Sequence, residues 1–343
     1  MQVRVTAKDR SFAFEAGHGE KILYAGLRAG ASLPYECATG TCGTCKAHLV
    51  SGEVENLWPE APGKKSFRAG RNEFLMCQCA AKSDLEIEIA RAAPAFAGEC
   101  AVGSRSGTIR AVRALTHDVT AVDVELDQPC DFDAGQFMAV LAPGLAGARG
   151  YSMVNFEPSA RKLEFVIKKK PGGGFSEWLF SDKAQGARIE LHGPLGKATF
   201  APGADRHLLV IAGGSGIAGM MSILKRASGT GHFGKFRGDV FFGVRTMKDA
   251  FYLQELSDFA SENVKITIAL SDEDVPETAS KDWPKLRFER GFVHEVAKRA
   301  MAGRYENVRA YLAGPPPAVD ASIRFLLVEA KLKPDAIRYD RFS

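Results

Sequence analysis

The sequence has no apolar run long enough to span a bilayer, no long run of like charge, no internal repeat and no low-complexity segment. The first absence argues against a membrane span, and residues 1–6 alternate like a strand and lack the apolar core of a signal peptide. A balance of 45 basic against 41 acidic residues, net +4, argues against a nucleic-acid footprint. We therefore expect a cytoplasmic protein with neither nucleic acid nor membrane as a partner.

Cysteine is scarce, with seven residues in 343, and most of them gather in one region. Clustered cysteines fit a metal site in a reducing compartment better than a disulfide framework. Cys100 and Cys130 stand apart, and we interpret both as incidental. With 45% hydrophobic and 25% charged residues, the rest of the chain has the composition of an ordinary globular protein of two or three domains.

The gathered cysteines have a diagnostic spacing. Cys37, Cys42 and Cys45 lie in one loop with four and then two residues between them, and Cys77 follows after 31 more residues. This pattern is typical of plant-type iron-sulfur loops. Zinc is the weaker alternative, because structural zinc sites usually combine two close pairs of ligands. Cys79 stays open as the fourth ligand, since Cys77 and Cys79 flank one residue of an expected strand and would face the same way.

The pattern of elements predicts three domains, at residues 1–93, 104–202 and 203–343. The first has strands, a short helix, the cysteine loop and further strands, which is a β-grasp order. The second has closely spaced strands with almost no helix, which predicts a six-stranded antiparallel β-barrel. Residues 90–98, rich in small side chains, are expected to link these two domains.

The third domain has a different pattern of elements, because its strands alternate with helices from residue 207 onward. That alternation predicts a parallel α/β sheet with helices on both faces. The fold class expected for the whole chain is therefore multidomain, α+β and α/β.

A glycine-rich turn at residues 213–219 follows the first strand of the third domain and opens a helix. Backbone N–H groups and the helix dipole hold a dinucleotide pyrophosphate at such a turn. Gly214, Gly216 and Gly219 satisfy G-x-G-x-x-G, but the acidic residue expected later is missing and Arg245 stands there instead. Arg245 could in principle pair with a 2′-phosphate.

Two patterns in the second domain suit a flat cofactor that carries phosphates. Arg149, Tyr151 and Ser152 place a cation, an aromatic ring and a hydroxyl on one short strand. A run of lysines that begins at Lys168 then leads to a glycine-rich turn and a short helix, which we expect Ser176 to cap. Of these lysines, we interpret only Lys168 as a binding residue.

These motifs resemble a known family, the NADH-dependent reductase components of bacterial multicomponent aromatic-ring oxygenases. The resemblance rests on the cysteine loop with residues 75–78, on R-x-Y-S at residues 149–152, on GGSGIA at residues 213–218 and on the Gly-Pro-Pro turn at residues 314–316. Residues 52–63 and 339–342 look most like the toluene monooxygenase reductases. In this family a plant-type ferredoxin domain is fused to a ferredoxin-NADP reductase-like module.

The resemblance implies three cofactors, a 2Fe-2S cluster, FAD and NADH. It favours Cys77 over Cys79, because residues 75–78 match the family's L-x-C-Q, and it places Ser152 near the flavin N5 as the catalytic side chain. The implied cluster ligands are Cys37, Cys42, Cys45 and Cys77. The implied cofactor-binding residues are Arg149, Tyr151, Ser152, Lys168, Gly173, Gly174, Ser176, Gly214, Ser215, Gly216, Ile217, Arg245, Gly314, Pro315, Pro316 and Phe342, the last as a ring that covers the flavin.

Two positions depart from the family pattern. The family usually has proline where this chain has Gly219, and cysteine where it has Ala313. The second departure removes a sulfur expected near the nicotinamide, so we expect slower hydride transfer than is usual in the family.

The order of cofactors implies the function, since a flavin can take two electrons from NADH and release them one at a time to a 2Fe-2S cluster. The expected protein is an NADH-dependent reductase that serves an oxygenase or a separate ferredoxin. The alternatives are a non-enzymatic electron relay or redox sensor, and the same reductase serving a non-oxygenase acceptor.

Overall fold

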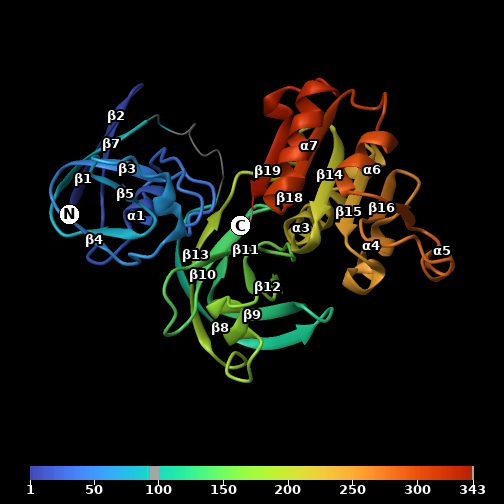
Figure 1. The fold of residues 1–343 in the computed structure, drawn as a ribbon, viewed down its shortest axis with the longest axis horizontal. Helices are drawn as coiled ribbons and strands as arrows, with labels where there is room; N and C mark the ends of the chain where they lie inside the picture. Colours follow the sequence, from blue (N-terminus) through green and yellow to red (C-terminus); the bar gives the residue numbers. More distant parts are fainter. Residues whose placement is uncertain (91, 93–99, 342–343) are drawn as a thin grey trace.

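The computed structural model describes residues 1–90, 92 and 100–341, and these form three units in chain order (Figure 1). The N-terminal unit carries β1 to β7, the middle unit β8 to β13 and the C-terminal unit β14 to β19. The middle unit lies between the other two, so its sheet can contribute to sites shared with either neighbour.

The N-terminal unit is a five-stranded sheet in the order β2-β1-β7-β3-β5, with one helix packed against it. β1 and β7 pair in parallel, and the other neighbours are antiparallel. β7 alternates buried and exposed residues, as a strand with one covered face must. The elements are β1 (Gln2–Ala7), β2 (Ser11–Glu15), α1 (Ile22–Arg28), β3 (Lys46–Ser51), β4 (Val54–Asn56), η1 (Pro62–Ser66), β5 (Glu73–Leu75), β6 (Cys79–Ala81) and β7 (Leu85–Ile89).

The expected strand through Cys77 and Cys79 is wrong. β5 ends at Leu75 and β6 begins at Cys79, and the amide of Gln78 donates to the Leu75 carbonyl across the turn between them. The two cysteines are therefore not related by the alternation of a strand, and Cys77 is free to face the cysteine loop while Cys79 belongs to β6.

The middle unit is one six-stranded antiparallel sheet in the order β11-β10-β13-β8-β9-β12. An isolated bridge between Met153 and Phe165 brings the two ends of this order together. Its apolar interior is a separate core, to which Val124, Leu163 and Phe165 contribute fully buried side chains. The elements are β8 (Gly103–Ala114), β9 (Val119–Cys130), β10 (Phe137–Leu141), β11 (Arg149–Ser152), β12 (Ala160–Lys168), α2 (Gly174–Leu179) and β13 (Arg188–Leu195).

The C-terminal unit is a six-stranded parallel sheet in the order β17-β16-β15-β14-β18-β19, as the alternation of strands and helices predicts. β14 sends Val210 to a core shared with α3 and Ile211 to one shared with α6 and α7, so both faces are covered. The elements are β14 (His207–Gly213), η2 (Gly214–Gly216), α3 (Ile217–Gly229), η3 (His232–Gly234), β15 (Gly238–Val244), η4 (Met247–Asp249), α4 (Leu253–Phe259), β16 (Val264–Leu270), α5 (Ala279–Asp282), β17 (Arg287–Arg290), α6 (Val293–Ala300), β18 (Val308–Gly314), α7 (Pro316–Val328), η5 (Pro334–Ala336) and β19 (Ile337–Arg341).

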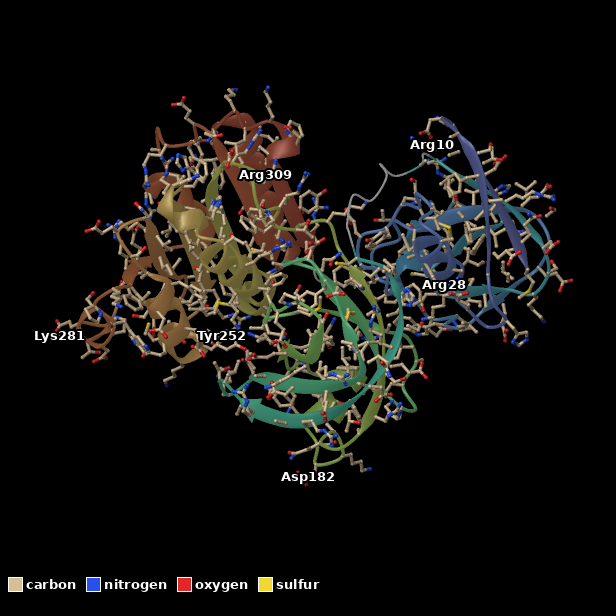
Figure 2. The ribbon with its side chains drawn as sticks, turned by 180° about the vertical axis from the view of Figure 1, so that it is seen from behind. Arg10, Arg28, Asp182, Tyr252, Lys281 and Arg309 are labelled. Atoms are coloured by element: carbon tan, nitrogen blue, oxygen red, sulfur yellow. The ribbon has the colours of Figure 1, made fainter. Side chains whose placement is uncertain are left out.

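Polar contacts join the middle unit to the C-terminal unit. The Arg226 guanidinium lies 2.7 Å from the Asp133 carboxylate, and the Ser222 hydroxyl accepts from the Gly135 amide at 2.8 Å. The Tyr252 hydroxyl donates to Glu164 at 2.7 Å, and Figure 2 shows Tyr252 on the side of its unit that faces the middle sheet. These contacts hold the C-terminal unit so that the side carrying the glycine-rich turn faces the middle unit.

Among the described residues, no helix combines the length and the apolar character that a membrane crossing requires.

Candidate functional site

The cysteine loop brings four thiols together as two facing pairs. The sulfurs of Cys37 and Cys42 lie 3.1 Å apart, and those of Cys45 and Cys77 lie 3.2 Å apart. Cys42 is exposed, whereas Cys45 and Cys77 are fully buried. The structure thus places together all four residues that the sequence nominates as ligands.

Backbone amides of the loop point at these sulfurs. The Thr39 and Cys42 amides each lie 3.4 Å from the Cys37 sulfur, and the Thr44 amide lies 3.4 Å from the Cys42 sulfur. The hydrogen bond from the Cys42 thiol, helped by the Thr39 and Cys42 amides, lowers the pKa of Cys37. Donors of this kind stabilise thiolate sulfur, the form that binds iron.

Cys79 sits in a different environment. Cys79 is buried in β6, within the core of the N-terminal unit. No sulfur contact joins Cys79 to the other four cysteines among the described residues, which favours Cys77 as the fourth ligand. Four convergent sulfurs with aimed amides fit a 2Fe-2S cluster, because four cysteine thiolates are the usual ligand set of that group.

A cavity of about 510 Å³ lies where the three units meet. Cys37 and Trp58 from the N-terminal unit, the β11 strand from the middle unit, and Ser215 from the C-terminal unit all line it. A ligand here would therefore contact the cysteine loop and the glycine-rich turn of the C-terminal unit at once. Its middle-unit lining includes the following sequence-nominated residues: Arg149, Tyr151, Ser152, Lys168, Gly173 and Ser176.

Arg149 offers an uncompensated positive charge to this cavity. Its guanidinium carbon lies 5.0 Å from the centre of the Trp58 ring, and its Nη1 donates to the Ala148 carbonyl at 3.0 Å. No carboxylate of the described residues forms an ion pair with it. A cation without an acidic partner at the wall of a cavity fits a phosphate-bearing ligand such as FAD.

Ser152 and Tyr151 occupy the deeper wall of the same cavity. Ser152 is 7% exposed, and burial raises the pKa of the Tyr151 phenol well above its usual range, so the ring stays neutral. Gly219 of α3 packs directly on Ser152, since a Cβ added there would lie 3.2 Å from the serine Cβ. The departure from proline at 219 therefore lies in contact with the predicted catalytic hydroxyl.

The turn before α2 corrects one expectation. Gly173, not Ser176, is the N-cap of α2, and Ser176 lies inside the helix. The Ser176 hydroxyl instead accepts from the Lys170 amide at 3.0 Å and donates back to carbonyls of the turn. Ser176 thus shapes the turn, and Gly174, which begins the helix, does not line the cavity.

A second cavity, of about 340 Å³, follows the carboxyl ends of the parallel strands in the C-terminal unit. Gly214, Ser215, Gly216, Gly314 and Pro315 line it, as the sequence predicts. Gly216 must lack a side chain, because a Cβ there would lie 2.6 Å from the backbone of Ala313 and Gly314. The two strand ends approach closely here, at the carboxyl edge where open parallel sheets commonly bind their ligands.

Two nominated residues support this cavity without lining it. Ile217 is completely buried in the core under α3, and Pro316 begins α7. Ala313, which replaces the usual cysteine, is 3% exposed and packs in the same core. Phe342 lies outside the described residues.

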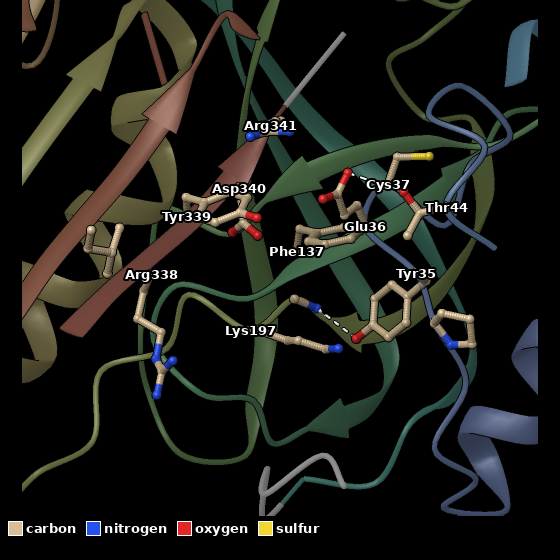
Figure 3. Close-up of a pocket in the computed structure, with 13 residues that line it drawn as sticks. Tyr35, Glu36, Cys37, Thr44, Phe137, Lys197, Arg338, Tyr339, Asp340 and Arg341 are labelled. Atoms are coloured by element: carbon tan, nitrogen blue, oxygen red, sulfur yellow. Dashed lines mark hydrogen bonds between the residues drawn. The ribbon is translucent and has the colours of Figure 1, made fainter. Parts of the chain in front are cut away.

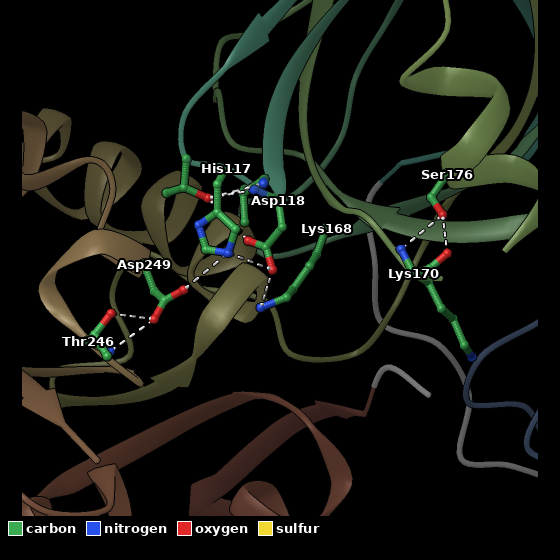
Figure 4. Close-up of polar contacts among 9 residues, drawn as sticks. His117, Asp118, Lys168, Lys170, Ser176, Thr246 and Asp249 are labelled. Atoms are coloured by element: carbon green, nitrogen blue, oxygen red, sulfur yellow. Dashed lines mark hydrogen bonds and ion pairs between the residues drawn. The ribbon is translucent and has the colours of Figure 1, made fainter. Parts of the chain in front are cut away.

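The outer rim of the second cavity carries charges from two units (Figure 4). Lys168 Nζ lies 3.0 Å from the Asp118 carboxylate, and Lys168 lines both cavities. Asp249 accepts from the Thr246 amide and hydroxyl at 2.9 and 2.8 Å. His117 is exposed, and its ring lies 3.8 Å from the Asp118 carboxylate and 4.0 Å from that of Asp249. It forms ion pairs with them only when it is protonated.

Sequence reasoning missed several residues of these cavities. Phe292 is 58% exposed at the second cavity, where its ring stacks on His294, and Trp58 lines the first cavity from another unit. No spacing signal marks either residue. Both residues are recognised only from the structure, where an aromatic ring lies exposed at a cavity.

A third cavity, of about 330 Å³, separates the cysteine loop from the C-terminal strand β19 (Figure 3). The Tyr35 hydroxyl accepts from the Gly196 amide at 3.2 Å, and Lys197 Nζ lies 5.3 Å from the Tyr35 ring. Burial, and then the nearby Glu36, raises the pKa of Asp340 to about 7. The N-terminal and C-terminal units therefore approach each other across this cavity, with charged side chains from both units at its wall.

Family models match three segments of the chain in order. Residues 5–82 match a 2Fe-2S iron-sulfur cluster binding domain, residues 106–200 an oxidoreductase FAD-binding domain, and residues 210–323 an oxidoreductase NAD-binding domain. Each segment lies in one of the three units described above.

Relatives match over almost the whole length. A ferredoxin–NAD(P)+ reductase of Metapseudomonas resinovorans is 38% identical over 95% of this chain and 95% of its own. The ferredoxin–NAD+ reductase component of the alkene monooxygenase system of Xanthobacter autotrophicus is 33% identical over 96% of this chain and 98% of its own. Among solved structures, a ferredoxin reductase in carbazole 1,9a-dioxygenase matches with a TM-score of 0.82 and 34% identity, covering 100% of this chain and 99% of that one.

Proposed function

This chain belongs to the ferredoxin–NAD(P)+ reductases of multicomponent oxygenase systems, and from that premise we propose which residues carry out its electron transfer and for which partner. It is an oxidoreductase with a 2Fe-2S cluster, FAD and a nicotinamide nucleotide as cofactors. When bound, FAD accepts a hydride and gives up electrons singly, and the cluster carries single electrons.

The single observation that carries the residue assignment is the cavity of about 510 Å³ at which the three units meet. Cys37 and Ser215 both line it, so one ligand there would contact both the cluster loop and the nucleotide turn. Arg149 supplies the positive charge for the FAD phosphates, and Ser152 supplies a hydroxyl beside the reacting ring. The chain's own contribution is placement, not acid–base chemistry.

The remaining assignments extend this proposal. Cys37, Cys42, Cys45 and Cys77 hold the cluster, as two facing thiol pairs support. Gly214, Ser215, Gly216, Gly314 and Pro315 receive the nucleotide, with Ile217 and Pro316 behind them. Tyr151, Lys168, Gly173 and Ser176 complete the FAD site, and Arg245 contacts the adenosine end of the nucleotide.

We also propose the finer fold assignments. The domains span residues 1–93, 104–202 and 203–343. The parallel pairing of β1 with β7 supports a β-grasp fold for the first, and the bridge between Met153 and Phe165 supports a closed barrel for the second. NADH is the proposed electron donor, and an oxygenase component or a separate ferredoxin of an aromatic-ring oxygenase system is the proposed acceptor.

A visible spectrum of the purified protein tests the assignment. We expect flavin and iron-sulfur bands together, both bleached by NADH under anaerobic conditions. Iron-sulfur bands alone would instead indicate an electron relay without a working reductase half. Rapid mixing of the NADH-reduced protein with candidate oxygenase components, against a non-oxygenase redox protein, would then identify the acceptor.

A further inference from the structure

One edge of the cluster loop faces solvent. Cys42 and Thr44 are exposed, whereas Cys45 and Cys77 are buried and Cys37 lines the internal cavity. Given the proposed function, on which the following inference rests, electrons enter from the side of Cys37. The exposed side at Cys42 is then the nearest approach for an acceptor protein.

The segment beside this edge is basic. Lys46, Lys64, Lys65 and Arg68, which we name the cluster-edge basic surface, surround the contact between the cysteine loop and η1. Gly43 packs on Ser66, since a Cβ added at Gly43 would lie 2.4 Å from the serine hydroxyl. Lys46 Nζ donates to the Ser66 carbonyl at 2.7 Å, which holds its ammonium at the same place.

Acidic groups do not neutralise this surface. Glu73 lies 3.3 Å from Lys46, but its side chain is only 7% exposed and it also accepts from the Arg68 amide at 2.6 Å. The side chains of Lys65 and Arg68 form no ion pair with any described carboxylate, and both residues are exposed. Glu36 lines the gap toward β19 and accepts from the Thr44 hydroxyl at 3.3 Å, so its negative charge, with that of Glu73, offsets only part of the four positive charges. The solvent-facing edge therefore presents a net positive charge.

We propose that the cluster-edge basic surface is the docking site for an acidic face of the electron-acceptor protein. Opposite charges on two faces accelerate their encounter and fix the orientation in which the redox centres approach. Such steering weakens with salt, because the screening length falls from roughly 30 Å at about 0.01 M to roughly 8 Å at about 0.15 M ionic strength.

Two haem proteins of opposite charge serve as probes, acidic cytochrome b5 and basic cytochrome c. Each NADH oxidised to NAD+ releases one proton and two electrons, which reduce two ferric haems to ferrous. We expect the rate with cytochrome b5 to fall steeply between low and physiological ionic strength, and the rate with cytochrome c to stay level or rise. Titration of the protein with cytochrome b5 in the absence of NADH measures binding without turnover.

The test variant is Lys65→Glu/Arg68→Glu, since neither side chain makes a hydrogen bond that its loss would break. The matched control is Lys281→Glu/Lys285→Glu, an equal change of net charge on two exposed lysines of the C-terminal unit, where Figure 2 labels Lys281 far from the N-terminal unit. At low salt we expect the test variant to lose about tenfold or more in both rate and affinity with cytochrome b5. The control should lose little of either.

A further assay distinguishes failure of the proposed function from failure of the docking proposal. It measures the reduction of uncharged 1,4-benzoquinone by NADH, which consumes one proton and gives hydroquinone and NAD+. If the parent protein fails to reduce the quinone, the proposed function is wrong, while the titration still decides the docking surface. If the test and control variants bind cytochrome b5 equally, or if salt leaves binding unchanged, the docking proposal is wrong.

Discussion

The imidazole ring of His192 stacks on the phenol ring of Tyr24, with centroids 3.7 Å apart and planes 10° from parallel. His192 belongs to β13 of the middle unit and Tyr24 to α1 of the N-terminal unit. The Tyr24 hydroxyl donates to the Ala38 carbonyl of the cysteine loop at 3.0 Å. One ring pair thus ties the middle sheet to the loop that carries the cluster ligands.

This stack should make the junction sensitive to acid. Burial lowers the pKa of His192 to about 3 from an unfolded value of about 6.5, so its contribution to stability is present above pH 6.5 and is lost as the pH falls toward 3. By pH 5 the loss amounts to about 2 kcal/mol. His192→Phe keeps a ring against Tyr24 but cannot take up a proton. The midpoint of thermal unfolding should therefore drop less in this variant than in the parent between pH 7 and pH 5, and equal drops would contradict the prediction.

Trp58 should contribute to FAD affinity from outside the FAD-binding unit. Its ring holds the Arg149 guanidinium at 5.0 Å, and a cation–π contact of this kind is worth about 0.5–1 kcal/mol at a partly exposed site. Trp58→Leu should weaken FAD binding about two- to fivefold, and Trp58→Phe should weaken it less. Fluorescence titration of the FAD-depleted protein measures both.

A double-mutant cycle separates this role from mere packing. With Arg149→Lys as the second change, the loss caused by Trp58→Leu should shrink, because the planar guanidinium that stacks on the ring is gone. Additive losses would show that Trp58 acts on the fold and not through Arg149.

Cys77, not Cys79, should be required for the cluster. The Cys77 sulfur lies 3.2 Å from the Cys45 sulfur, whereas Cys79 belongs to β6 and makes no sulfur contact with another described cysteine. Cys77→Ser should abolish the cluster's visible absorption and its low-temperature paramagnetic signal, and Cys79→Ser should keep both. The reverse pattern would overturn the assignment.

The nucleotide preference should favour NADH. The Asp272 amide donates to the Arg245 carbonyl at 2.9 Å, and Glu273 accepts from the Met247 amide, so two acidic residues lie near Arg245, the basic residue proposed to meet a 2′-phosphate. A kcat/KM for NADPH above that for NADH would contradict this. Asp272→Asn should raise kcat/KM for NADPH about fivefold, since two unit charges about 4 Å apart in water interact by about 1 kcal/mol. NADH, which lacks the phosphate, serves as the internal control.

The parts of the site that lie close together in sequence were predictable. Three of the four proposed cluster ligands fall within nine residues, and the glycine-rich turn follows its strand directly, so spacing alone nominates both. Periodicity likewise predicted the parallel sheet and the six antiparallel strands, because each strand pattern is local.

The parts of the site that depend on packing between units could not be predicted from the sequence. Trp58 reaches the first cavity only because the N-terminal unit docks on the loop before β11, where Gly147 contacts its ring. Ser176 looked like a helix cap because serine favours that position, but its hydroxyl is used by the turn from Lys170. Cys77 looked like a strand residue because no turn-forming residue marks the break between β5 and β6.

The hydrophobic core of the N-terminal unit includes side chains of the middle unit. Phe137, Ala139, Ala148 and Leu195 of the middle unit are buried in the same cluster as Ile22 and Met76. Excising residues 1–93 as a free electron carrier would leave the side chains that pack on those four facing water. A chimaera that grafts this segment onto another reductase would need to bring the four receiving residues with it. The distance between the iron-sulfur cluster and the flavin therefore depends on this interface. A change of acceptor is more readily made at the solvent-facing edge of the cysteine loop than by exchange of whole domains.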